Sequence, residues 1–121
     1  MAKVMVVDDS PTDVANLRRI LEKAGHQVID ASDATSAIAR VRDEQPNVVL
    51  MDVVMPGVNG FQATRTLSRD PATGHIPIVV VSAKNQETDR VWAMRQGAKA
   101  YLVKPYKDAD LIKCLESVLS V

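Results

Sequence analysis

The chain has 121 residues, which suffices for one domain with a single core, and its 46% hydrophobic and 25% charged residues are ordinary for a soluble globular protein. Fifteen basic residues balance fifteen acidic ones, which argues against nucleic-acid binding by bulk charge, and the single cysteine, Cys114, cannot form an internal disulfide. Because the start at 1–3 lacks signal-peptide features and no apolar run could cross a bilayer, we expect a cytoplasmic protein without membrane insertion.

Short apolar strand patterns alternate with helical patterns five times along the chain. After a strand at 4–7, the segment 10–13 predicts a helix start, with a serine cap, a proline at the first helical position and an acid in the first turn. Gly25 is expected to end that helix. A shorter and more polar strand at 27–31 suits a sheet edge, and a helix from about Asp33 to Pro46 follows it.

The second half of the chain continues this alternation. Its predicted elements are, in order, a strand at 47–52, a helix through Phe61 and Leu67, a strand at 78–82, a helix at 87–96, a strand at 100–103 and a helix at 109–119. The segments 53–60 and 71–77 are rich in glycine, proline and other turn residues and predict loops. No linker or repeat interrupts the pattern, so we expect a single domain over 1–121 with no output domain.

The three longest strand patterns are apolar at every position. Strands that are buried on both faces have this pattern, so helices should cover both sides of the sheet. Five right-handed βα units then predict a doubly wound, five-stranded parallel sheet, the flavodoxin-like (βα)5 arrangement. The strand order 2-1-3-4-5 is favoured because it makes the first and third strands neighbours and places the topological switch point between them.

Four strand patterns stop at residues that can hold charge or phosphate, namely Asp8-Asp9, Asp52, Ser82 and Lys104. In an open parallel sheet these stops share one edge, where such folds bind ligands. Three carboxylates there repel one another, at about 4 kcal/mol for each pair about 4 Å apart if the effective dielectric constant is about 20. Lys104 and a hard cation such as Mg²⁺, which prefers oxygen ligands, are the expected compensating charges.

A site with Mg²⁺, an amine and a hydroxyl can stabilise a transferring phosphoryl group. Asp52, the lone acid after the central strand, is the candidate nucleophile that would become an aspartyl phosphate, and Asp8-Asp9 is the candidate metal-binding pair. Taken singly, each residue has a structural alternative: Asp8-Asp9 as a helix cap, Asp52 as a turn residue, Ser82 as a loop start and Lys104 as a surface lysine. Their coincidence at one edge favours the functional interpretation.

The chain resembles the CheY-like receiver domain of two-component response regulators over essentially its whole length. The motifs that carry the resemblance are Asp8-Asp9, 49–52 with 55–57 and 59–60, Ser82-Ala83, and 101–105. The resemblance implies that Asp52 accepts a phosphoryl group from a CheA-like histidine kinase. It also implies that Mg²⁺ is held by Asp9, Asp52 and the backbone carbonyl of Val54, and through water by Asp8.

Further roles are implied by the same resemblance. Ser82 and Lys104 would bind the phosphoryl oxygens, and Tyr101 would rotate inward as Ser82 moves. The Lys104–Pro105 peptide bond is expected to be cis, an isomer that proline makes accessible at a cost of about 0.5–1 kcal/mol. We therefore expect a signalling protein, not an enzyme in the ordinary sense, that assists its own phosphotransfer and dephosphorylation.

The stretches 50–65, 84–92 and 95–98 resemble the PilG/PilH-type receivers of type IV pilus twitching motility. We expect a stand-alone monomer that signals by phosphorylation-dependent protein binding. The expected binding face comprises helix 87–96, strand 100–103 and helix 109–119, and it carries Trp92, Tyr101, Tyr106 and Lys107. Open alternatives are a flagellar chemotaxis-type regulator, a phosphate sink, a small phosphohydrolase with an Asp nucleophile, or a flavin-binding protein, although the last lacks a phosphate-cradling loop.

Overall fold

The computed structural model describes residues 1–54 and 59–119, in which five strands alternate with five helices. The strands are β1 (Lys3–Val7), β2 (Gln27–Ala31), β3 (Val48–Met51), β4 (Ile78–Ser82) and β5 (Ala100–Val103). The helices are α1 (Pro11–Lys23), α2 (Ala34–Glu44), α3 (Gly60–Arg69), α4 (Glu87–Arg95) and α5 (Asp108–Leu119). All strand pairs are parallel and their order is β2-β1-β3-β4-β5, as predicted.

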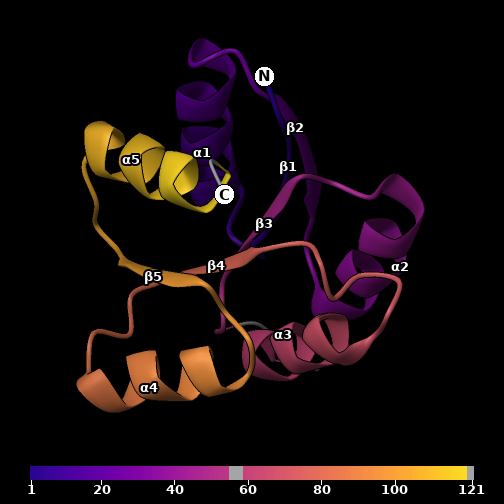
Figure 1. The fold of residues 1–121 in the computed structure, drawn as a ribbon. Helices are drawn as coiled ribbons and strands as arrows, with labels where there is room; N and C mark the ends of the chain where they lie inside the picture. The colour runs from indigo at the N-terminus through magenta and orange to yellow at the C-terminus, as the bar shows by residue number, and fades with distance from the viewer. Residues whose placement is uncertain (55–58, 120–121) are drawn as a thin grey trace.

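Helices cover both faces of this sheet. Helices α1 and α5 lie on one face, and α2, α3 and α4 lie on the other (Figure 1). Strands β3 and β4 are buried at every residue, as is β1 beyond its first, which explains why these three sequences are apolar throughout. The edge strand β2 is only partly buried, in agreement with its more polar sequence.

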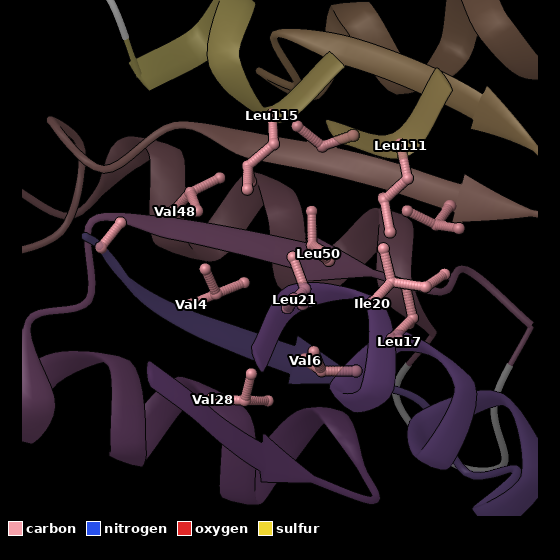
Figure 2. Close-up of a cluster of buried hydrophobic side chains, with 13 residues drawn as sticks. Val4, Val6, Leu17, Ile20, Leu21, Val28, Val48, Leu50, Leu111 and Leu115 are labelled. Atoms are coloured by element: carbon pink, nitrogen blue, oxygen red, sulfur yellow. The ribbon is translucent and has the colours of Figure 1, made fainter. Parts of the chain in front are cut away.

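The core on the α1–α5 face shows how the sheet is held. Leu17, Ile20 and Leu21 of α1 and Leu111 and Leu115 of α5 pack over the central strands (Figure 2). Each fully buried Leu or Ile side chain contributes about 1.5–3 kcal/mol relative to an exposed one, so this layer fixes the two helices against the sheet. No helix within the described ranges is long and apolar enough to span a membrane.

Local signals set most helix ends, with three small corrections, one of which is that α4 ends at Arg95 and not at Gln96. Ser10 caps α1 by accepting a hydrogen bond from the Asp13 backbone N–H at 3.3 Å. Helix α2 ends at Glu44 and not at Pro46, because the proline disfavours helical geometry in the residue before it and Gln45 adopts a left-handed φ of 48°. Helix α5 begins at Asp108, one residue earlier than predicted.

The pairing of β1 with β3 positions the residues that follow these strands. Val7 lies opposite Met51, so Asp8 and Asp52 leave the sheet side by side at its carboxyl edge. The Asp52 backbone N–H donates to the Val7 carbonyl at 2.9 Å, which extends the ladder by one step. This is the switch point at which α1 and α3 pass to opposite faces of the sheet (Figure 1).

Candidate functional site

The ammonium group of Lys104 joins three carboxylates at the carboxyl edge of the sheet. Its Nζ atom donates to Asp8 Oδ2 at 2.8 Å, to Asp13 Oδ2 at 2.8 Å and to Asp52 Oδ2 at 3.1 Å. These side chains come from the ends of β1, β3 and β5 and from the first turn of α1. The structure therefore brings together Asp8, Asp52 and Lys104, which the strand-end pattern had placed at one edge.

This cluster is largely shielded from solvent. The side chains of Asp8, Asp52 and Lys104 are only 3%, 11% and 15% exposed, whereas that of Asp13 is 43% exposed. Burial by itself would lower the pKa of Lys104, but hydrogen bonds to Asp13, Asp8 and Asp52 outweigh it and raise the pKa above its ordinary value. Lys104 is therefore a fixed positive charge that balances one of the three carboxylates.

Backbone groups orient the two buried carboxylates. Asp8 Oδ1 accepts a hydrogen bond from the Ser10 N–H at 2.9 Å, and Asp52 Oδ1 accepts one from the Val54 N–H at 2.9 Å. Each carboxylate thus has one oxygen held by the chain that follows its strand and the other held by Lys104. Both side chains are pre-organised, so a reaction at Asp52 would require little rearrangement.

Asp52 is also packed closely against the start of α3. A Cβ atom added to Gly60 would overlap the Asp52 carbonyl oxygen and the Val53 Cα atom. Only glycine allows this approach, so Gly60 ties the first turn of α3 to the strand end that carries Asp52. The predicted Met55-Pro56-Gly57 motif lies outside the described residues.

Ser82 is the last residue of β4, and its carbonyl accepts a hydrogen bond from the Lys104 N–H at 2.8 Å, whereas Tyr101 lies within the neighbouring strand β5. Ser82 is fully buried, and its Oγ accepts a hydrogen bond from the Lys84 N–H at 3.2 Å. The ring of Tyr101 is buried, and its hydroxyl donates to the Lys84 carbonyl at 2.8 Å. Burial raises the pKa of Tyr101, and the Arg90 guanidinium lies 5.8 Å from the ring centroid. The tyrosine thus occupies an inward position.

The remaining predicted site residues have different surroundings. Asp9 is exposed and, together with Asp8, lines a hollow of about 350 Å³ between α1 and β2 that also includes Arg18 and Asp30. The side chain of Val54 is exposed, so its predicted contribution is limited to its backbone carbonyl. The Lys104–Pro105 bond is cis, as the sequence resemblance implied.

The oxygen donors at this edge fit a Mg²⁺ ion that keeps several of its waters. Within residues 1–54 and 59–119, no three His, Cys, Asp or Glu side chains are grouped as a metal centre made of side chains alone. Mg²⁺ does not need such a centre, because it keeps several waters and binds through one or two carboxylates. The residues fit this mode: Asp8 and Asp52 lie together, all donors are oxygens, and the three carboxylates outnumber Lys104.

Two features of the site were not found from the sequence. Asp13 was interpreted only as a first-turn acid of α1, yet its carboxylate binds Lys104. A signal existed, because the first turn of α1 follows directly on the β1 edge. Trp92, which the sequence predicts on the face of α4, β5 and α5, also lines a hollow of about 260 Å³ with Phe61 and Arg65 of α3. Which side of α4 faces α3 depends on helix packing.

Comparisons with known proteins agree with this geometry. The response regulator receiver domain family matches residues 4–116. Protein PilH of Pseudomonas aeruginosa is 52% identical over 120 residues, covering 99% of each chain. The Vibrio cholerae chemotaxis protein CheY4 has a TM-score of 0.92 at 30% identity, covering 98% of this chain and 99% of its own.

A further solved structure is the receiver domain of a sensor histidine kinase from P. aeruginosa, with a magnesium ion coordinated in its active-site cleft. It has a TM-score of 0.92 at 25% identity and covers 99% of this chain and 97% of its own. Sequence, strand order and the cluster at the carboxyl edge thus agree, and the resemblance drawn from the motifs is confirmed: the chain belongs to the response regulator receiver domain family.

Proposed function

We propose that this chain is a stand-alone response regulator that is phosphorylated on Asp52 by a histidine kinase. Receiver domains are signalling domains, so the reaction is a switch and not the turnover of a metabolite. The observation that carries the proposal is the position of Asp52, a buried carboxylate held by the Val54 N–H and Lys104 at the switch point. A carboxylate with that support is a pre-organised nucleophile.

The transfer uses these groups in distinct roles. An Asp52 carboxylate oxygen attacks phosphorus, the bond from phosphorus to the kinase histidine breaks, and the imidazole leaves with that electron pair. Lys104 neutralises charge on the phosphoryl oxygens, and the Ser82 hydroxyl donates a hydrogen bond to one of them. Asp8, Asp9, Asp52 and the Val54 carbonyl would hold Mg²⁺, which supplies additional positive charge at the same oxygens. The magnesium ion in the active-site cleft of the P. aeruginosa receiver domain supports a metal site in this chain.

The test of this function is phosphorylation by acetyl phosphate in the presence of Mg²⁺. We expect intact-protein mass spectrometry to show a single phosphoryl adduct. Hydroxylamine should remove it, because an acyl phosphate is cleaved by that nucleophile whereas a serine phosphate is not. Failure to form an adduct with Mg²⁺, or an adduct that resists hydroxylamine, would contradict the proposal.

The likeness to PilH supports a role in type IV pilus twitching motility, with a CheA-like kinase as phosphodonor. We place the protein in the cytoplasm as a single-domain monomer over 1–121. The likeness to a chemotaxis protein keeps a flagellar regulator as the second candidate. A phosphate sink would need its aspartate but no output partner. A phosphohydrolase would instead release phosphate from small esters in excess over protein, so multiple turnovers would favour that class.

We place the output surface on α4 and its neighbours β5 and α5. Val91, Trp92 and Met94 are exposed apolar residues of α4, Lys107 is exposed, and Tyr106 is half-buried. The surrounding chain has a basic excess, since residues 59–119 contain nine Lys or Arg against six Asp or Glu, although the whole chain is neutral. An apolar patch in a basic setting favours a partner with acidic residues around an apolar anchor. Because Trp92 also borders α3, this surface extends to the α3–α4 hollow.

Trp92→Ala is expected to separate output from phosphorylation. Trp92 is 48% exposed, and an aromatic anchor at an interface commonly contributes about 2 kcal/mol, so its loss should weaken partner binding about tenfold or more. In a strain that lacks this protein, we expect the variant to form the acetyl phosphate adduct normally but to restore surface motility poorly. Thr35→Ala, an exposed change on α2, is the control that should restore it fully. Full restoration by Trp92→Ala would exclude this residue from the output surface.

A further inference from the structure

Lys104 also contacts Asp13, a residue to which the proposed function gives no role. Its contact with Asp13, at 2.8 Å, equals its contact with Asp8 and is shorter than the 3.1 Å contact with Asp52. Asp13 lies in the first turn of α1, and its own N–H is bound by the capping Ser10. The carboxylate is therefore anchored by the start of a helix while it reaches the centre of the site.

The position of a lysine ammonium group depends on an acceptor that stays in place. This group is a compact charge on a flexible four-carbon stem with three donors, so its position is set by the acceptors around it. Under the proposed function Asp52 carries the phosphoryl group and Asp8 faces the metal ion through water. Both acceptors therefore change their surroundings during the cycle. Asp13 has neither duty and can keep its hydrogen bond to Lys104 throughout.

The surroundings of Asp13 and Lys104 support this separate role for Asp13. Asp13 and Lys104 line a hollow of about 360 Å³ with Asn16, Ala83, Pro105 and Tyr106. Of the described residues that line it, Lys104 is the one cation, so no second positive charge in this hollow competes for Asp13. The carboxylate also lies at the positive end of the α1 dipole, which attracts negative charge.

We propose that Asp13 is a positioning residue that holds Lys104 directed at Asp52 before and after phosphorylation. The inference rests on the proposed function. It extends that function by making the first turn of α1 part of the phosphorylation machinery. The alternative to this proposal is that Asp13 competes with the phosphoryl group for Lys104 and repels the anionic phosphodonor. The two possibilities predict opposite changes in rate.

The test is a double-mutant cycle on the rate of adduct formation with acetyl phosphate and Mg²⁺. Asp13→Asn keeps the size of the side chain but removes its charge, and we expect it to slow adduct formation about fivefold. Asp13→Glu, which restores the charge, should stay within about twofold of the wild type. In a Lys104→Met background Asp13→Asn should have no further effect, because the residue acts through the lysine. Asp110→Asn, an exposed acid in the first turn of α5, is the matched control.

A second measurement does not depend on phosphorylation. In the metal-free protein, NMR relaxation of the Lys104 side-chain carbons should show greater mobility in Asp13→Asn than in the wild type or Asp110→Asn. A faster rate in Asp13→Asn, an equal effect in both Lys104 backgrounds, or unchanged Lys104 mobility would overturn the proposal. If the wild type formed no adduct but Lys104 became mobile in the variant, the proposed function would fail while the positioning contact stood.

Discussion

Replacing Asp52 by alanine is expected to abolish the phosphoryl adduct formed with acetyl phosphate and Mg²⁺. The change removes the nucleophilic oxygens of the buried carboxylate at the end of β3, which accepts a hydrogen bond from the Val54 N–H. Asp8 is also buried, but its Oδ1 is bound by the Ser10 N–H and it lies at the end of β1. We expect the phosphoryl adduct to be absent from the intact-protein mass spectrum of this variant.

The variant should remain folded, because Lys104 keeps two carboxylate partners, Asp8 and Asp13, when Asp52 is removed. A circular dichroism spectrum and thermal unfolding would establish this. Asp43→Ala removes an exposed acid from α2 and serves as the control that still forms the adduct. An adduct of undiminished yield in Asp52→Ala would place the phosphoryl group elsewhere in the chain.

Replacing Lys104 by methionine should destabilise the metal-free protein by about 3 kcal/mol. Methionine preserves much of the length of the side chain but leaves the buried carboxylates of Asp8 and Asp52 without their cation, and breaking a buried pair costs about 3–5 kcal/mol. The free energy of unfolding, measured with urea, gives the difference. Lys107→Met, two residues beyond the cis proline and exposed, should change it little.

Mg²⁺ should stabilise the Lys104→Met variant more than the wild type, because the ion then supplies the positive charge that the lysine gave these carboxylates.

The loss of stability that Lys104→Met causes in the metal-free protein should be constant between about pH 6 and pH 9. The pKa of Lys104 is raised in the folded state, so its contribution is fully present below the ordinary value of 10.5 and is lost only as the pH rises through the folded-state pKa. A destabilisation that varied within that range, or no greater effect of Mg²⁺, would contradict this account.

The site residues at strand ends could be predicted because the carboxyl ends of parallel strands lie at the same edge of the sheet. The strands that end at Asp8, Asp52 and Ser82 are apolar on both faces, which predicts buried parallel strands and one shared carboxyl edge. The register of β1 with β3 then brings Asp8 beside Asp52 without further information from the loops. The sequence favoured the observed strand order without fixing it, because that order makes β1 and β3 neighbours and places these acids at the switch point.

Asp13 and Trp92 could not be placed in this way, because both lie on helices. A first-turn acid has a sufficient local explanation in the helix dipole, so the nearness of Asp13 to the β1 edge did not by itself indicate a hydrogen bond to Lys104. Trp92 shares α4 with exposed Val91 and Met94, and local periodicity does not reveal that the ring borders α3. The end of α2 at Glu44 was likewise decided by the backbone of Gln45 before the proline.

The sequence alone determined the five βα units, the fully buried central strands and the set of strand-end residues, because apolar patterning and chain alternation are local properties. Only the tertiary structure decided which groups share the Lys104 ammonium and how Tyr101 and Trp92 are oriented. Those contacts depend on how far helices α1 and α4 lie from the sheet edge. That distance is set by the packing of side chains from several elements at once.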